Sequence, residues 1–245
     1  MKKYVNLFVF VFMIGACLSQ GRAQTKSAVS YKNPVVDIAM PDPTVIKAAD
    51  GYFYVYATES TRNVPIMKSK DLVEWTYCNT AFTNKTRPRF EPKAGIWAPD
   101  INYINGKYVL YYAMSVWGGE QTCGIGVATA NSPQGPFTDH GKMFRSNEIG
   151  VQNSIDPSLL QYEGRNYLVW GSFRGIYVIE LTADGLSIMS GAKKKRIAGT
   201  AFEAVYIHKH GDYYYMFASI GSCCQGVKST YKVVVGRSKK VWGPY

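Results

Sequence analysis

The 245-residue sequence has few histidines, few cysteines and no long hydrophobic run beyond its first residues. Its 3 histidines and 5 cysteines show no spacing typical of a zinc site, so we expect no metal centre. No segment after the first residues could cross a bilayer. Sustained helical periodicity is also lacking, and with an aromatic content of 14% this predicts an all-β chain.

Acidic residues are outnumbered, with 17 Asp and Glu against 28 Lys and Arg and a formal charge of +11. Such a charge favours contact with acidic polymers, for example uronic-acid polysaccharides. It does not by itself indicate nucleic acid as a partner, because no nucleic-acid-binding motif accompanies it. We interpret the densest basic cluster, Lys193-Lys194-Lys195-Arg196, as a solvated loop between two repeats.

The first residues have the pattern of an export signal. Met1-Lys2-Lys3 is a charged start, the apolar run ends at Ile14, and Gly21-Arg22-Ala23 is a cleavage site. We expect residues 1–23 to be a signal peptide, which makes the mature protein periplasmic or secreted. An alternative reading takes Ile14-Gly15-Ala16-Cys17 as a lipobox, with a lipid anchor on Cys17.

A carboxylate precedes a short apolar run, a glycine turn and an aromatic strand four times along the chain. The acids are Asp42, Asp100, Asp156 and Glu203, and the turn glycines are Gly51, Gly106, Gly164 and Gly211. Repeats of 47 to 58 residues with several short strands are the mark of a β-propeller, one blade per repeat. We expect the four acids to occupy equivalent places at the start of each innermost strand and to meet at one mouth of the channel.

Each repeat divides into short strands. The expected strands are 44–48, 52–58, 64–69, 75–79, 101–104, 108–115, 125–130, a segment near 142–144, one at Leu159, 167–171, 176–181, 205–208, 213–218 and 232–237. Residues 24–245 are therefore predicted to form one β-propeller domain of about four blades. The fourth repeat ends before an outermost strand, and we expect the sequence to be truncated at its C-terminus.

Three of the acids have no basic neighbour: Asp42, Asp156 and Glu203. Carboxylates gathered at a partly buried axis repel one another, so at least one becomes harder to ionise. Glycoside hydrolysis uses such a pair, one protonated and one ionised, on opposite sides of a sugar. Glu203 has the longer reach and suits the general acid, Asp42 the general base and Asp156 a pKa modulator. The alternative is that these acids cap turns, as Asp-Pro often does.

Three aromatic residues are candidates for binding a sugar at the same mouth. Trp97 lies beside a channel-facing motif and could equally serve in packing between blades. Trp117, in a glycine-rich loop, is expected at the rim, and Phe173 follows the end of an inner strand where it could line the sugar pocket.

The ordered motifs resemble glycoside hydrolase family 43. The matching segments are Pro41-Asp42-Pro43-Thr44-Val45, Trp97-Ala98-Pro99-Asp100-Ile101, Ile155-Asp156-Pro157-Ser158-Leu159, Phe202-Glu203-Ala204 and a long match from Gly211 to Tyr245. The resemblance implies a five-bladed parent propeller that hydrolyses by inversion, with the same roles for Asp42, Asp156 and Glu203. Asp100 would be a structural or substrate-subsite acid.

The resemblance also bears on cofactors and substrate. It implies no cofactor for the chemistry, and a possible structural calcium in the full-length parent whose ligand histidine is absent here. The segment Gly221-Ser222-Cys223-Cys224 is most similar to arabinan-active members, which implies α-L-arabinofuranosyl linkages of plant polysaccharide as the substrate.

Several alternatives stay open. The chain could be a non-catalytic glycan-binding propeller derived from such an enzyme, or an enzyme of the same class acting on β-xylosides or galactosides. Cys223 and Cys224 could form a vicinal disulfide or remain two buried thiols.

Overall fold

The computed structural model describes residues 30–245. The chain divides into an N-terminal segment, Met1–Tyr31, and a second unit, Lys32–Tyr245, which is the one described below. The expected signal peptide at residues 1–23 and the alternative anchor at Cys17 lie outside the described residues. Among residues 30–245, no helix has the length and hydrophobicity needed to span a membrane.

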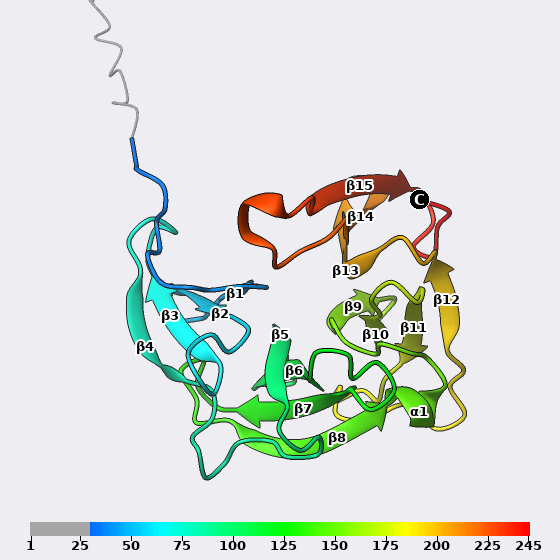
Figure 1. Ribbon diagram of the computed structural model, residues 1–245, viewed down its shortest axis with the longest axis horizontal. Helices are drawn as coiled ribbons and strands as arrows, with labels where there is room; N and C mark the ends of the chain where they lie inside the picture. Colours follow the sequence, from blue (N-terminus) through cyan, green and yellow to red (C-terminus); the bar gives the residue numbers. More distant parts are fainter. Residues whose placement is uncertain (1–29) are drawn as a thin grey trace, which may run out of the picture. The chain divides into compact units, whose positions relative to one another are not determined.

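The unit Lys32–Tyr245 consists of four antiparallel sheets, each one blade of a β-propeller (Figure 1). The first blade holds β1 (Thr44–Lys47), β2 (Phe53–Tyr56), β3 (Pro65–Ser69) and β4 (Thr76–Thr80). The second holds β5 (Gly95–Ile104), β6 (Lys107–Ser115), β7 (Gly124–Ala130) and β8 (Thr138–Arg145). The third holds β9 (Ser158–Tyr162), β10 (Arg165–Trp170), β11 (Ile176–Glu180) and β12 (Lys195–Ala198). The fourth holds β13 (Glu203–His210), β14 (Tyr213–Ile220) and β15 (Lys232–Ser238).

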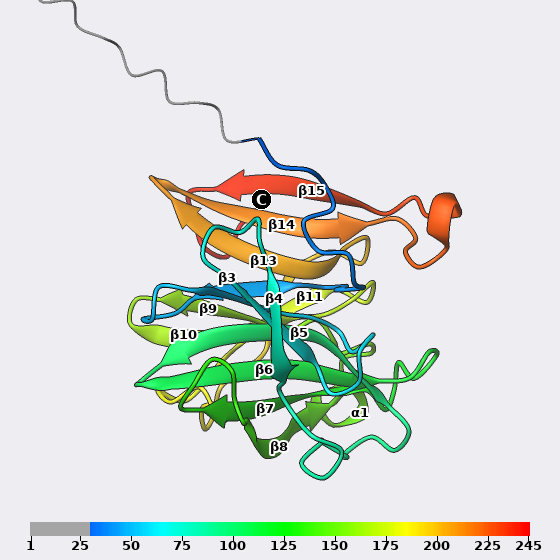
Figure 2. The same ribbon diagram turned by 90° about the vertical axis from the view of Figure 1, so that its left-hand side faces the viewer.

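Strands follow one another across each sheet in chain order, and β1, β5, β9 and β13 lie innermost (Figure 1). A short helix, α1 (Ser146–Ile149), and a 3-10 turn, Gly226–Lys228, complete the described elements. The all-β class and the four-bladed propeller predicted from the repeats are confirmed. The loop between β14 and β15, which carries the 3-10 turn, projects beyond the end of its sheet (Figure 2).

The strand β6 shows how neighbouring blades pack. Leu110 and Tyr112 are buried in a cluster shared with the first blade, whereas Val109 and Tyr111 are buried in a cluster shared with the third. Because successive side chains of a strand point to opposite faces, this sheet is covered by a blade on each side. Full burial of a side chain of this size contributes roughly 1.5–3 kcal/mol. The apolar runs of the inner strands are therefore what holds the blades together.

The basic cluster Lys193-Lys194-Lys195-Arg196 was expected to be a loop, and this expectation is wrong for its second half. Lys195 and Arg196 begin β12, the outermost strand of the third blade. An edge strand leaves backbone groups unpaired, and charged side chains there oppose pairing with another chain. The cluster therefore has a structural use at a sheet edge.

A residue in the left-handed conformation precedes or interrupts the innermost strand of every blade. These residues are Asp42, Ala98, Asp156 and Ala204, with φ of 50°, 41°, 57° and 51°. Each comes two residues before the strand residue that pairs with Tyr56, Tyr111, Val169 or Phe217 respectively. They occupy the same place in their blades, so this kink is the true repeated feature.

The kink corrects the expectation that the four acids are equivalent. Asp42 and Asp156 occupy the kink itself, but Glu203 comes one residue before it and Asp100 two residues after it. The register shifts at this point in β5 and β13, where two residues oppose one on the partner strand. Only two of the four acids are therefore related by the symmetry of the blades.

Candidate active site

Asp42 lies at the mouth, exposed to solvent, immediately before the innermost strand of the first blade. The Thr58 hydroxyl donates a hydrogen bond to Asp42 Oδ2 at 2.5 Å. Thr58 Oγ1 in turn accepts the backbone N–H of Ala98 at 2.7 Å, so its own hydrogen is directed to the carboxylate. Asp42 Oδ1 accepts no hydrogen bond from residues 30–245, so it can accept one from a water molecule.

Glu203 is held by an arrangement of the same kind. The Ser172 hydroxyl donates to Glu203 Oε2 at 2.6 Å, and Ser172 Oγ accepts a hydrogen bond from Asn153 Nδ2 at 2.9 Å. Ser172 is buried, and its backbone bridges to that of Glu203 across the third and fourth blades. The second carboxyl oxygen, Oε1, accepts no hydrogen bond from Ser172 and is the one suited to carry a proton.

Asp156 links these two acids electrostatically. Burial raises the pKa of Asp156 well above its ordinary value, and the negative charges of Glu203 and Asp42 raise it further. The backbone N–H of Ala204 acts in the opposite direction but does not outweigh them. The structure thus brings together the three acids predicted from the sequence, and the group retains a proton that isolated carboxylates would lose.

Tyr231 is a fourth member of the site that sequence reasoning missed. It lies at the end of the β14–β15 loop, and its hydroxyl interacts with the side chains of Glu203 and Ser219. Burial raises the pKa of Tyr231, and the nearby charges of Glu203 and Asp156 raise it as well. Tyr231 therefore stays protonated at neutral pH and can donate to an acid of the site.

The same loop contains a vicinal disulfide between Cys223 and Cys224. The alternative of two buried thiols is wrong, because the pair is oxidised and Cys224 is exposed. The N–H of Ser222 donates to Thr230 Oγ1, and the N–H of Thr230 donates to the carbonyl of Ser222. The loop that presents Tyr231 is thus closed on itself by covalent and hydrogen bonds.

Asp100 lies away from the other three acids and is 9% exposed. Its Oδ2 accepts the N–H of Leu159 at 2.8 Å and the Nδ2 of Asn102 at 2.7 Å. Burial raises the pKa of Asp100 to about 6, although these bonds and one with Thr44 lower it. Because its partners come from the first, second and third blades, the contacts favour the structural alternative over a substrate subsite.

The two tryptophans form a pair at the mouth. The ring of Trp97 lies 5.4 Å from that of Trp117, at 51° between their planes. Trp97 packs on a small cluster containing Ala113, Cys123 and Ile155, whereas Trp117 is 77% exposed. Trp97 therefore supports Trp117 from behind and leaves an indole face to solvent.

Phe173 also lies beside the acids. It follows Ser172, adopts a φ of 50°, and its N–H donates to the carbonyl of Phe202 at 2.9 Å. Its ring is half-buried next to the residue that holds Glu203. This place is compatible with the predicted lining of a sugar pocket.

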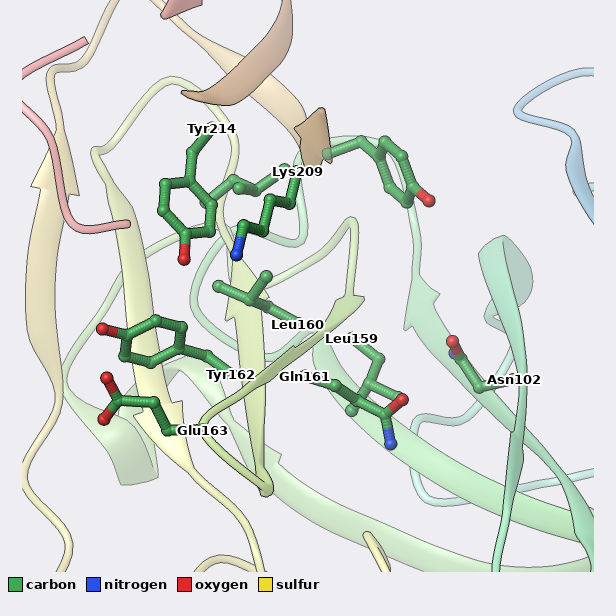
Figure 3. Close-up of a pocket in the computed structure, with 10 residues that line it drawn as sticks. Asn102, Leu159, Leu160, Gln161, Tyr162, Glu163, Lys209 and Tyr214 are labelled. Atoms are coloured by element: carbon green, nitrogen blue, oxygen red, sulfur yellow. The ribbon is translucent and has the colours of Figure 1, made fainter. Parts of the chain in front are cut away.

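A cavity of about 510 Å³ opens elsewhere in the unit, toward the far ends of β9 and β13 (Figure 3). Its lining includes Asn102, Tyr162, Glu163, Lys209 and Tyr214, and Figure 3 shows the Lys209 amine directed between the two tyrosines. None of the three acids lines it. Asn102, which lines this cavity, also donates a hydrogen bond to Asp100.

Within residues 30–245, no three His, Cys, Asp or Glu side chains are grouped so that they could hold a metal ion. These residues do not fit the calcium site that the resemblance implied for the parent, and we assign no step of the chemistry to a metal.

The described chain is thus a β-propeller that presents three electrostatically linked carboxylates and an exposed aromatic face. The profile of Glycosyl hydrolases family 43 matches residues 31–245. The chain belongs to this family.

Relatives of known name support the same family. The chain is 38% identical over 217 residues to the extracellular endo-α-(1→5)-L-arabinanase 1 of Bacillus subtilis, covering 83% of this chain and 66% of that one. It is 36% identical over 232 residues to the extracellular exo-α-(1→5)-L-arabinofuranosidase of Cellvibrio japonicus, covering 83% and 65%. The solved α-L-arabinanase of Cellvibrio cellulosa, complexed with arabinohexaose, superposes with a TM-score of 0.75 at 32% identity and coverage of 85% and 73%. The chain thus spans just under two thirds of the length of these two curated relatives.

Proposed function

We propose that this protein is an exported, inverting glycoside hydrolase that cleaves α-L-arabinofuranosyl linkages of arabinan. The observation that carries the proposal is that Asp42 and Glu203 each accept a hydrogen bond from a hydroxyl group on one carboxylate oxygen. Thr58 and Ser172 each donate a hydrogen bond to one oxygen of Asp42 and Glu203 respectively. The other oxygen of Asp42 is left for a water proton, and the other oxygen of Glu203 can carry the proton that an acid must deliver.

In the proposed reaction, Glu203 donates a proton to the glycosidic oxygen as the bond between that oxygen and the anomeric carbon breaks. A water molecule attacks the anomeric carbon from the opposite face and passes its proton to Asp42. The new carbon–oxygen bond has inverted configuration. A positioned acid and a positioned base each contribute roughly 10²–10⁴ to the rate. Solvent then returns a proton to Glu203 and removes one from Asp42.

Asp156 has a supporting part in this scheme. It lies within the electrostatic reach of both reacting acids, and its raised pKa reflects their charges. Asp156 is thus electrostatically linked to both Asp42 and Glu203, and we assign it the part of a modulator of these two acids.

The substrate assignment rests on the relatives together with the mouth of the site. The relatives named above include enzymes described as acting on α-(1→5)-linked arabinan, and one was solved with arabinohexaose. The exposed indole of Trp117, backed by Trp97, offers a flat apolar surface on which a sugar ring can lie. Such a surface suits a neutral oligosaccharide.

Export is inferred from the signal-like first residues and from relatives described as extracellular. The vicinal disulfide agrees with this, because disulfides persist in oxidising compartments outside the cytosol.

The direct test is the Glu203→Gln variant, measured on linear arabinan, on an aryl arabinofuranoside and on xylan. We expect hydrolysis of the arabinose substrates to fall by about 10²–10⁴ while circular dichroism stays unchanged. Glu74→Gln, an exposed glutamate of the first blade, is the matched control. Early NMR spectra of the released sugar should show the inverted anomer.

Two outcomes would contradict the proposal. Full activity of Glu203→Gln would show that Glu203 is not the acid. Binding of arabinan by the unmodified protein without any release of reducing ends would instead support a non-catalytic glycan-binding propeller.

A further inference from the structure

A cationic pocket of about 410 Å³ lies beside the candidate active site, on the first blade and the connection that leads into β5. Its lining includes four basic residues, Arg62, Arg87, Arg89 and Lys93. The walls between them are apolar and are formed by Pro88, Pro92, Ala94 and Met114. The pocket therefore combines positive charge with flat apolar surface.

Two of the guanidinium groups are fixed in place by one residue, Asn84. Arg62 Nε donates to Asn84 Oδ1 at 3.0 Å, and Arg89 Nη2 donates to the backbone carbonyl of Asn84 at 2.9 Å. Asn63 Nδ2 donates to the same Oδ1 at 3.2 Å and holds the amide. Each guanidinium keeps further N–H groups, so both are oriented and still able to bind an anion.

Arg87 has a different task. It forms a largely buried ion pair with Glu59 and donates to the carbonyl of Ala94 at 2.7 Å. Burial acts to raise the pKa of Glu59, but the bond from Arg87 and two backbone N–H groups outweigh it and hold this pKa below its usual value. The pair stays ionised and fixes the floor of the pocket.

The remaining positive charge is not neutralised within the protein. The one acid in the lining, Glu91, pairs with Arg145 at 2.7 Å. In the part of the chain that the structure describes, Arg62, Arg89 and Lys93 form no ion pair. Three exposed basic side chains thus lie among the apolar walls, and none of the ion pairs within residues 30–245 involves them.

The pocket is connected to the reacting groups by the chain itself. Glu59 directly follows Thr58, whose hydroxyl holds Asp42. Ala94, on the other wall, lies three residues before Trp97, which supports the exposed face of Trp117. Short stretches of chain thus join the pocket both to the residue that holds Asp42 and to the tryptophan pair.

We propose that this pocket is a subsite for a carboxylate-bearing sugar, a uronic acid within the polysaccharide substrate. The proposal rests on the proposed function and extends it to the charged part of the substrate. Planar guanidinium groups match a carboxylate with two parallel hydrogen bonds, and the two prolines suit the apolar face of the ring. A bare inorganic anion would use the cations and leave the apolar wall unused.

The test is a titration of the full chain with trigalacturonate at low ionic strength, with arabinotriose as the neutral comparison. The pocket variant is Arg89→Gln/Lys93→Gln. The control variant is Lys195→Gln/Arg196→Gln, which removes the same charge from the edge strand β12. We expect the dissociation constant for trigalacturonate to rise at least about tenfold in the pocket variant and less than about twofold in the control.

Three results would overturn the proposal: no binding of trigalacturonate by the unmodified chain, an equal loss in both variants, or equally effective competition by inorganic phosphate at the same ionic strength. The second would show a diffuse effect of net charge, and the third a general anion site.

The rate on a neutral aryl arabinofuranoside separates this proposal from the proposed function. We expect the pocket variant to match the unmodified chain on this substrate, because neither substituted residue touches the reacting acids. Trigalacturonate binding without hydrolysis of the aryl substrate would refute the hydrolase and leave the subsite standing. Hydrolysis without trigalacturonate binding would do the reverse.

Discussion

Two hydroxyl groups, those of Thr58 and Ser172, each bind one oxygen of Asp42 and Glu203 respectively. Each hydroxyl accepts an N–H from a third residue, so its single hydrogen can go only to the acid. A hydrogen bond to a charged group of this kind is worth roughly 1.5–3 kcal/mol. The two acids are therefore oriented before any substrate arrives.

The Ser172→Ala variant tests this orientation. Because Oε2 of Glu203 is then no longer held, kcat should fall about tenfold. The matched control is Ser115→Ala, a buried serine at the end of β6 that donates to the carbonyl of Val116.

A simple packing role for Ser172 would give a different result. Both alanine variants would then lose similar stability in urea, and kcat would fall by the same factor in both.

Sequence reasoning found the three acids but not the groups that orient them. Asp42, Asp156 and Glu203 stand in apolar surroundings, which is a visible signal. Thr58, Ser172 and Tyr231 are common residue types at strand ends and in a loop, and only the fold brings them to the acids. A regular signal of the kink is present in three repeats: Pro43, Pro99 and Pro157 each come directly after the kink residue, whereas the acids lie before it, on it or after it.

At the scale of elements, the β14–β15 loop carries both Tyr231 and the vicinal disulfide. Its vicinal disulfide closes a ring between adjacent residues, so it removes little conformational freedom from the unfolded chain. We expect the Cys223→Ser/Cys224→Ser variant to unfold in urea within about 1 kcal/mol of the unmodified chain. Its kcat/KM should nevertheless fall about fivefold, because Tyr231 is presented by this loop.

Alkylation of the denatured protein before and after reduction provides the covalent check. Cys78 and Cys123 are free thiols and should react at once, and Cys223 and Cys224 only after reduction. Immediate reaction of all four would show that the disulfide does not form.

The strands were predictable to different degrees, for a physical reason. The second strand of each blade shows as an apolar, aromatic run, so β2, β6, β10 and β14 lie where expected, the first three of them largely buried. The start of β5 at Gly95 was missed because its bulge contains Pro99, which interrupts a strand pattern. The edge strand β12 was missed because its exposed residues are charged, as in a loop.

For the whole molecule, Asp100 connects the pH to the stability of the propeller. Burial raises its pKa from 3.8 to about 6, so between these values the folded state binds more protons at this site than the unfolded state. The contribution of Asp100 to the free energy of unfolding therefore falls as the pH rises through this range, by roughly 3 kcal/mol at most.

The Asp100→Asn variant should remove this pH dependence while retaining an oxygen for the N–H of Leu159. Relative to the unmodified chain, it should gain stability between pH 4 and pH 7 in urea unfolding, with the exposed Asp212→Asn as control. A relative stability that is the same at both pH values would contradict the assignment.

The left-handed kink that all four blades share has a consequence for how such a molecule can arise. Copying one ancestral blade would carry the kink into every copy, because the backbone needs it to enter the innermost strand. Copying would not place an acid equivalently in every blade, because Glu203 lies one residue before the kink and Asp100 lies two residues after it. The kinked scaffold is thus what duplication can pass on, whereas the position of the acid relative to the kink differs from blade to blade.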